Sequence, residues 1–445
     1  MSLSSRFLNY CVLVPACLLI FNGFGRLEAA GLDRNGIGAA SMGTAGASVA
    51  RPKDPLQRLT QNPASLSELT GFEFQLGGTL AYAEGDFSQR GQYRGRLTDT
   101  WGVLPDVAAT LPLGEKAGIG LSLTTDTTRL ANWQITDVPG ALADARYAQR
   151  THRSEILNLR AALGLGVELG GGFSIGASVG GVYTRNELRS PYTFQNNQLA
   201  GAKTWLDLES DGFGVDGDLG LQWKVSKNLT LGLSYRTPTS FSTSGEARGD
   251  AGRQAQALGV RGADGRFRYD ADVDTELPQK VAAGFNASLT EHWRLMGQVD
   301  WVNWSAAYSD LNVRLSNGSN ALVNQLAGSS SLRDTTALDW EDQFVFRLGS
   351  EWDLTEALVL RLGYAYGKSP VPGSTLLPMT AAISEHTLAC GLGWQVGRVT
   401  VDLGYQYDLP ISRSAPADKI TGPEFRDSEV SLEAHWVGLT MGIKL

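Results

Sequence analysis

The stretch LVLRLGYAY, from Leu358 to Tyr366, alternates between two kinds of side chain along its whole length. Leucine or tyrosine occupies every second position, and Val, Arg, Gly and Ala occupy the positions between them. The stretches VTVDLGYQY (399–407) and LTLGLSYR (229–236) repeat this alternation. Successive side chains of a β-strand point to opposite faces, so a period of two predicts a strand. Each strand would have one apolar face that ends in aromatic residues and one face of small or polar residues.

The tyrosines at the strand ends indicate the kind of β-protein. A soluble β-sandwich buries the apolar face of each strand and has no need of aromatic residues where the strands end. A barrel that crosses a membrane turns this face to lipid and gathers Tyr and Trp at the lipid–water boundaries, around a polar interior. The final stretch, from Val437 to Leu445, alternates in the same way. We therefore predict an all-β fold, an antiparallel transmembrane β-barrel.

The alternation recurs along the chain and predicts fourteen strands. Six short turns and seven long loops alternate between them, which is typical of an outer-membrane barrel with tight periplasmic turns. Lipid offers the backbone no hydrogen-bond partner, so the last strand has to pair with the first. The predicted strands lie near 72–83, 101–113, 117–127, 154–168, 172–186, 206–223, 229–240, 276–289, 292–305, 341–353, 357–367, 385–396, 398–408 and 429–445.

The first 29 residues have the layout of a secretory signal peptide. Arg6 precedes an apolar segment at 7–24, and the small residues Ala29 and Ala30 follow it. This layout predicts cleavage after Ala29. A lipoprotein anchor at Cys17 is the alternative, although its apolar segment would be very short.

Cleavage would leave Cys390 as the single cysteine, which excludes an internal disulfide. The order of turns and loops places residues 30–71 on the periplasmic side, before the first strand. The predicted organisation is a signal peptide (1–29), an N-terminal segment (30–71) and a barrel (72–445).

Charge and residue spacing argue against several functions. The formal net charge of −8 argues against nucleic-acid binding, which requires a basic surface. No catalytic triad can be assembled from the sequence, and Gly-rich runs lack the strand–loop–helix context of a phosphate loop. We expect neither enzyme activity nor a cofactor nor a metal, with an outer-membrane lipase or protease as the enzymatic alternative. The histidines lack the spacing of a metal site, since they lie far apart at His152, His292, His386 and His435.

Several sequence blocks occur in an order typical of one family. The segment before the first strand is rich in Gly and Ala from Gly36 to Ala47 and then reads QNPASL (61–66). The blocks LGLSYR (231–236), RLGY (361–364) and SPVP (369–372) follow, with tryptophans at 293, 301 and 304 between the first two. Together these blocks resemble the FadL family, outer-membrane channels for long-chain fatty acids and aromatic hydrocarbons.

The resemblance implies a location, a mechanism and a set of partners. It implies a monomeric channel in the outer membrane of a Gram-negative bacterium, surrounded by membrane lipid, with residues 30–71 forming a hatch inside a 14-stranded barrel. A hydrophobic small molecule, a fatty acid or a monoaromatic hydrocarbon, would enter passively among the outer loops. It would leave by lateral diffusion through a gap near the kinked third strand. Two departures from the family pattern are the C-terminal Leu445 and the stretch Pro52–Pro55.

Two sets of candidate site residues follow. The resemblance assigns hatch and gating roles to Asn62, Pro63 and Ala64, which otherwise read as a simple turn. Alternation places several arginines inside the barrel, and a guanidinium suits bidentate contact with a carboxylate headgroup. We expect ligand contacts at Arg347 and Arg361. Arg185 is a third candidate because it resembles a basic position of the family, although the alternation along its strand places it at the rim of the barrel. The alternative is a structural network of ion pairs.

Two other functions remain open at this stage. A general porin for polar solutes would have a wide aqueous lumen, an inward-folded loop and no N-terminal plug. An adhesin or a purely structural barrel would place its function in the outer loops alone. The sequence does not distinguish fatty acids from hydrocarbons as substrates.

Overall fold

The computed structural model describes residues 34–445 except 99–100, 148, 197–198, 261, 263, 417–418 and 421–424. The predicted signal peptide and the first four residues of the predicted N-terminal segment lie outside the described residues. The strands are β1 (Glu73–Gln89), β2 (Tyr93–Thr98), β3 (Trp101–Pro112), β4 (Ala117–Thr136), β5 (Gln149–Gly170), β6 (Phe173–Thr193), β7 (Lys203–Lys224), β8 (Leu229–Arg236), β9 (Thr239–Asp250), β10 (Arg266–Leu277), β11 (Lys280–Ser288), β12 (Trp293–Val302), β13 (Asp310–Ser316), β14 (Leu332–Ala337), β15 (Gln343–Asp353), β16 (Leu358–Gly367), β17 (His386–Val396), β18 (Val399–Ala415) and β19 (Ser428–Lys444).

Short helices lie in the N-terminal segment and in the loops. They are α3 (Ala39–Gly43), α4 (Pro55–Thr60), α5 (Gly252–Ala257), α6 (Trp304–Ala307), α7 (Ala321–Ala327) and the 3-10 turns η2 (Pro63–Glu68), η4 (Gly373–Thr375) and η5 (Pro378–Thr380). No helix in the described part of the chain is long and apolar enough to cross a membrane.

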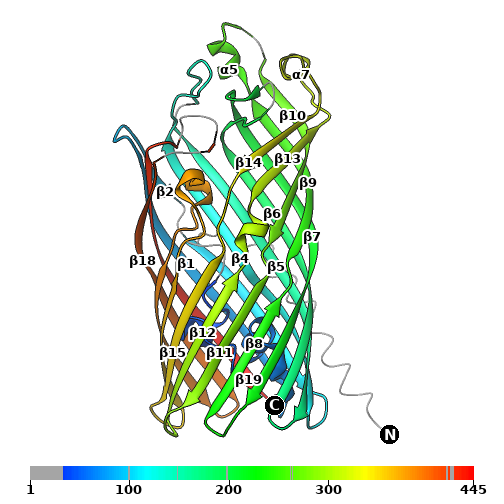
Figure 1. The fold of residues 1–445 in the computed structure, drawn as a ribbon, viewed down its shortest axis with the longest axis vertical. Coiled ribbons are helices and arrows are strands. Elements are labelled where there is room, and N and C mark those ends of the chain that lie inside the picture. Colours follow the sequence, from blue (N-terminus) through cyan, green and yellow to red (C-terminus); the bar gives the residue numbers. More distant parts are fainter. Residues whose placement is uncertain are drawn as a thin grey trace.

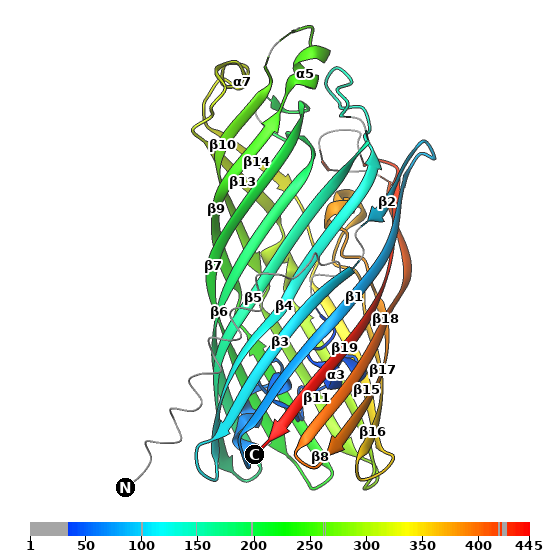
Figure 2. The same ribbon diagram turned by 180° about the vertical axis from the view of Figure 1, so that it is seen from behind.

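The strands form one closed antiparallel barrel, as the sequence predicts, with fourteen barrel strands around its circumference (Figures 1 and 2). Five of these barrel strands consist of two β-segments in line, namely β2 with β3, β8 with β9, β10 with β11, β12 with β13 and β14 with β15. The barrel closes where β1 pairs with β19 along its full length, from Glu73 opposite Lys444 to Gln89 opposite Ser428. Closure leaves no free sheet edge in lipid.

Several strands run further outward than the sequence predicts. The segment 128–153, expected to be a loop, contains the end of β4 and the start of β5, and the expected loop at 241–275 contains most of β9 and β10. The expected loop at 306–340 likewise holds β13 and β14. Above the membrane the outer face meets water, so its residues become polar and the apolar alternation disappears. The backbone pairing continues without that signal.

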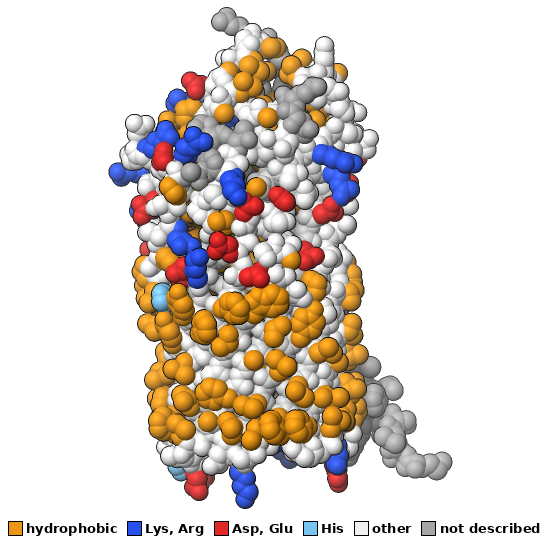
Figure 3. Space-filling view, viewed as in Figure 1, with side chains coloured by type: hydrophobic (Ala, Val, Ile, Leu, Met, Phe, Trp, Pro, Cys, Tyr) orange, Lys and Arg blue, Asp and Glu red, His pale blue; other side chains and the backbone are white. Residues whose placement is uncertain are grey.

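The outer wall carries an apolar band (Figure 3), and rings of aromatic side chains lie at its two boundaries. Near the periplasmic end, Phe173 stacks on Trp223 at 5.0 Å and Trp293 on Trp352 at 6.1 Å, measured between ring centroids. At the other boundary, His435 stacks on Tyr407 at 4.5 Å. Charged side chains lie mainly above and below this band (Figure 3). The band and its rings mark the part of the barrel that faces lipid.

Residues 34–71 fold inside the lower barrel and form the hatch. Its backbone packs against glycines that face the lumen, and a Cβ atom on these glycines would overlap hatch atoms. Gly176 and Gly220 contact Pro63 and Ala64, whereas Gly363 and Gly404 on the opposite wall contact residues 39–45. The wall is therefore shaped to the hatch, which it meets closely at both backbone and side-chain atoms.

The stretch from Pro52 to Pro55, which departs from the family pattern, starts helix α4. Asp54 is the N-cap, and its carboxylate accepts a hydrogen bond from the backbone N–H of Gln57 at 2.8 Å, while Pro55 takes the first helical position. Burial raises the pKa of the Asp54 carboxyl to about 6. The departure thus gives a capped helix within the hatch.

The loop between β16 and β17 also folds into the barrel, in its upper half (orange coil in Figure 1). Its residues Val371, Leu376 and Ile383 are buried, and η5 packs across the lumen against β4 and β5. A porin was expected to have such a loop but no plug. This chain has both the inward loop and the hatch.

Replacing Gly176 by alanine tests how tightly the wall fits the hatch. The added methyl overlaps the backbone of Pro63 and Ala64, so we expect the free energy of unfolding to fall by about 1–3 kcal/mol. Urea titration of the refolded barrel measures this change. Gly78→Ala is the matched control, because the nearest atom to its Cβ is Leu104 O at 3.8 Å. Equal stability of the two variants would contradict the close fit.

Candidate functional site

A polar cavity of about 180 Å³ lies in the middle of the lumen, directly above the hatch. The hatch contributes Arg34, Asn35 and Ile37 to its floor, together with Thr60 and Gln61 at the end of α4. The barrel contributes both basic and acidic side chains to the wall, namely Asp126, Asp218, Arg236, Lys280, Asp300, Arg347, Glu385 and Asp408.

An apolar cluster fills the lumen between this cavity and the outer loops. Four tryptophans belong to it, Trp133, Trp304, Trp340 and Trp436, and aliphatic residues of the inward loop pack against them. Trp304 and Trp340 lie 5.1 Å apart and Tyr308 stacks on Trp340 at 4.6 Å, measured between ring centroids. Aromatic and aliphatic walls of this kind suit an apolar small molecule.

The sheet has a break between β3 and β4. The two strands pair from Val107 opposite Leu123 down to Pro112 opposite Gly118. Pairing with β4 resumes on the other side through β2, from Thr98 opposite Asn132. Among the described residues of β3, none from 101 to 106 pairs with β4. Pro105 lies in this stretch and has no N–H to donate to a neighbouring strand.

On the far side of the break, β4 carries an extra residue. Thr124 lies opposite Arg160 of β5 and Thr127 opposite Asn158, so Thr125 and Asp126 share the single partner position of Leu159. Such a β-bulge bends its strand and redirects a side chain. Here the Asp126 carboxylate points into the lumen.

Arg34 of the hatch closes the break from inside. Its Nη1 contacts Asp106 Oδ1 at 2.9 Å and donates to Thr125 O at 3.0 Å. The backbone N–H of Thr125 also donates to Asp106 Oδ1, at 3.2 Å. The carboxylate of β3 and the guanidinium of the hatch therefore take the place of the missing pairing with β4.

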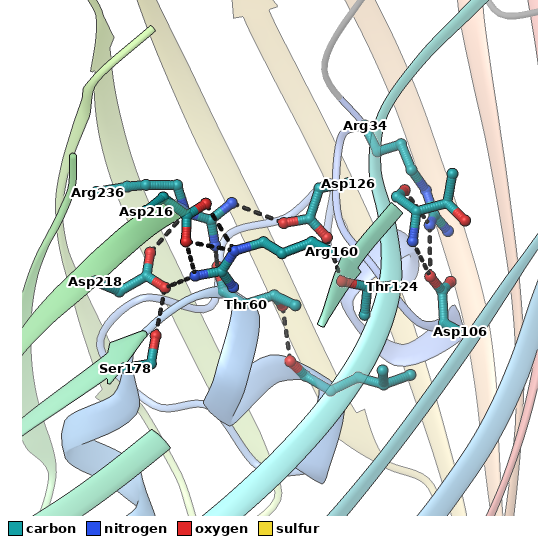
Figure 4. A network of polar contacts seen from close by, with 12 residues as sticks. Arg34, Thr60, Asp106, Thr124, Asp126, Arg160, Ser178, Asp216, Asp218 and Arg236 are labelled. Atoms are coloured by element: carbon teal, nitrogen blue, oxygen red, sulfur yellow. Dashed lines mark hydrogen bonds and ion pairs between the residues drawn. The ribbon is translucent and has the colours of Figure 1, made fainter. Parts of the chain in front are cut away.

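The bulge itself is held by a buried ion-pair network (Figure 4). Arg236 Nη1 contacts Asp126 Oδ2 at 2.8 Å, and its Nε contacts Asp218 Oδ1 at 2.6 Å. Arg160 joins Asp218 to Asp216 with contacts of 2.5 and 2.7 Å. Each cation in this network faces at least two carboxylates, which offsets the cost of burying its charge.

The three predicted ligand arginines lie in three different places. Arg347 reaches the cavity, but its Nε contacts Asp300 at 2.6 Å and its Nη1 donates to the hatch at Asn35 and Ala45. Arg361 is buried beside the hatch, between Glu351 and Asp402. Arg185 is exposed on the outer wall, 3.9 Å from Glu209.

These placements separate Arg185 from the lumen and give the other two arginines carboxylate partners. The arrangement around Arg347 and Arg361 is the ion-pair network that the sequence left open as the alternative. Their role as ligand contacts stays a prediction.

The Asn62–Ala64 turn anchors the hatch to the wall. The Asn62 side chain accepts from the N–H of Ala64 at 3.1 Å and donates to Val49 O at 2.8 Å and Leu221 O at 3.0 Å. Pro63 begins η2, where its lack of an N–H costs nothing. The turn is fully buried, and its gating role stays a prediction.

Two GxSxG sequences, at 172–176 and 176–180, lie on β6 and not at the strand-to-helix turn of a serine hydrolase. Ser174 accepts a hydrogen bond from Ser67 of the hatch at 3.0 Å, and Ser178 donates to Asp218 at 2.6 Å. Both serines therefore have structural partners in the wall.

The sequence did not single out Arg34, Asp106 or Asp126. Pro105 inside an alternating strand and the run TTDTT (124–128), which breaks the alternation, are the signals that could have indicated the break. Neither signal tells which hatch residue reaches it.

A sequence profile described as "Outer membrane protein transport protein (OMPP1/FadL/TodX)" matches residues 25–440. The chain belongs to this family. The family and its relatives place it in the outer membrane of a Gram-negative bacterium, as a transport protein.

The long-chain fatty acid transport protein of Escherichia coli K12 is 21% identical to this FadL-family chain over 416 residues, 85% of the chain and 87% of that protein. Alkane uptake protein A of Marinobacter nauticus is 27% identical over 184 residues, which are 39% of this chain and 37% of that protein. The crystal structure of the toluene transporter TodX from Pseudomonas putida superposes with a TM-score of 0.73 at 18% identity, covering 93% of this chain and 99% of that one. This likeness establishes the fold.

Replacing Arg34 by alanine in this FadL-family barrel tests the closure of the break. The change leaves Asp106 buried without its cation, so we expect the segment around Thr125 to open more easily, by about 3 kcal/mol. Hydrogen–deuterium exchange of the 120–130 segment should then be faster by about two orders of magnitude. Lys368→Ala, which removes an exposed ion pair with Glu341, is the control. Unchanged exchange in Arg34→Ala would contradict the closing role of Arg34.

Proposed function

We propose that this chain is a channel for passive uptake of small hydrophobic molecules, which leave the barrel sideways through the break between β3 and β4. The single observation that carries the proposal is this break, because it interrupts the wall at the level of the lumen cavity. The candidate substrates are fatty acids, alkanes or aromatic hydrocarbons, the compounds named for related proteins.

The layout of the lumen supports a route from the outer loops to the break. A ligand first contacts the apolar cluster around Trp304 and Trp340 and then the cavity above the hatch. Leu104, a buried member of that cluster, lies on the stretch of β3 that pairs with β1 but not with β4. The hatch blocks the straight path below, since its backbone lies in contact with the glycines of the wall. The sideways path needs only the contacts of Arg34, Asp106 and Thr125 to shift.

A general porin is less well supported. Its polar solutes require an aqueous path through the full length of the barrel, whereas this lumen holds an apolar cluster above and a fitted hatch below. The polar cavity between them is small, at about 180 Å³.

Removing the β4 bulge tests the proposal. Deleting Asp126 leaves one residue, Thr125, opposite Leu159 and lets β4 pair regularly past the kink. Arg236 keeps Asp218 as a partner. We expect uptake of whichever labelled compound the unaltered protein admits, toluene or oleate, to fall to the level of cells without the protein, with barrel assembly unchanged on a gel of unheated samples.

Asp126→Asn is the matched control, because it removes the charge and keeps the bulge. It should retain most of the uptake that the unaltered protein supports. Full uptake by the deletion variant would rule out the sideways route. If cells with the unaltered protein took up a small sugar faster than cells without it, and neither hydrophobic compound faster, a general porin would be favoured.

A further inference from the structure

Each basic side chain in the described wall of the lumen cavity has an interaction partner. Arg34 lies 2.9 Å from Asp106, Arg236 lies 2.6 Å from Asp218, and Arg347 lies 2.6 Å from Asp300. The remaining cation of the described cavity wall, Lys280, also has an interaction partner. A ligand carboxylate that enters this cavity would have to compete with these partners for a cation.

One carboxylate of the cavity wall has only neutral partners. Asp408 of β18 is buried, and its two oxygens accept hydrogen bonds from the hydroxyl of Thr387 and from the indole N–H of Trp436, the latter at 3.0 Å. Within the described part of the chain, no lysine or arginine forms an ion pair with it.

The hydrogen bonds around Asp408 suit its ionised form. Thr387 Oγ1 accepts a hydrogen bond from the side-chain amide of Asn35 at 2.8 Å and donates its own proton to Asp408. The indole of Trp436 can only donate. Both oxygens of Asp408 therefore accept, as those of a carboxylate do.

Asp408 lies where the apolar cluster meets the cavity. Its partner Trp436 belongs to both the cluster and the cavity wall, as do Val302 and Trp304 on the other side of the lumen. A molecule that leaves the cluster for the break between β3 and β4 crosses this level. Glu385 adds a second acid to the same wall, with Arg413 as its cation at 3.8 Å.

We propose that Asp408 selects uncharged hydrocarbons and excludes fatty-acid carboxylates from this channel. A hydrocarbon needs no polar partner in the cavity. A carboxylate headgroup meets paired arginines and one buried negative charge, which repels it. This selectivity rests on the proposed function, because it concerns the same route.

A pair of probes with equal chain length separates the headgroup from the chain. We would measure initial uptake of labelled dodecane and labelled dodecanoate by cells that lack their own fatty-acid channel and produce the wild type, Asp408→Asn or Asp408→Glu. The Asn variant keeps an acceptor for Trp436 and removes the charge, whereas the Glu variant keeps the charge. Asp272→Asn, on the outer wall, is the control for a lost carboxylate elsewhere.

The wild type should raise dodecane uptake and leave dodecanoate uptake at the background level. Asp408→Asn should raise dodecanoate uptake about tenfold, which corresponds to about 1.4 kcal/mol of removed repulsion, with dodecane uptake unchanged. Asp408→Glu and Asp272→Asn should behave like the wild type. Unchanged dodecane uptake also shows that each variant has folded.

Four results would overturn the proposal. If the wild type takes up dodecanoate as fast as dodecane, the channel has no such selectivity, although the proposed function stands. If Asp408→Asn still excludes dodecanoate, or if Asp408→Glu admits it, the charge of Asp408 is not the cause. If the wild type accelerates neither probe, the proposed function itself fails.

Discussion

In the lipid core every backbone N–H and C=O has to find a partner within the protein, and this constraint organises the whole structure. It requires the closed fourteen-stranded barrel and the full pairing of β1 with β19. It also makes the break between β3 and β4 informative. There the barrel lacks part of its pairing, and a hatch arginine and a β3 carboxylate bind the backbone of Thr125 instead. A wall that is closed by side chains can open without unfolding a strand.

The hatch and the barrel are fitted to each other by two different means. Glycines of the wall let the hatch backbone approach closely, and the Asn62 side chain donates to a backbone carbonyl of β7. Arginines of the wall, among them Arg347, reach the hatch from above. The glycine contacts hold the lower hatch in place, whereas Arg34 and Asn35 at its upper face contact the cavity, the break and the partners of Asp408. Movement of these two residues would therefore affect the route without displacing the plug.

The sequence predicted the barrel, its number of strands and the inward position of Arg347 and Arg361, because alternation follows directly from strand geometry. It missed the outer ends of strands such as β4 and β10. There the outer face meets water instead of lipid, so its residues are polar and apolar side chains no longer alternate with polar ones. It also named Arg347 and Arg361 without revealing that Asp300, Glu351 and Asp402 hold them, since ion pairs depend on register between strands. The contacts of Arg34 and Asp408 join segments that lie far apart in the chain, and local sequence patterns do not predict such contacts.

The sideways route is tested most directly by mapping the path of a ligand in the membrane-embedded protein. A hydrocarbon that carries a diazirine group, added to cells and activated by light, would label the residues along its route, and mass spectrometry would identify them. If the ligand leaves sideways, labels should appear on the apolar cluster, on β3 around Leu104 and on β4 around Thr125. Labels on Leu59 and Leu66, at the packed core of the hatch, would show passage through the plug and contradict the sideways route.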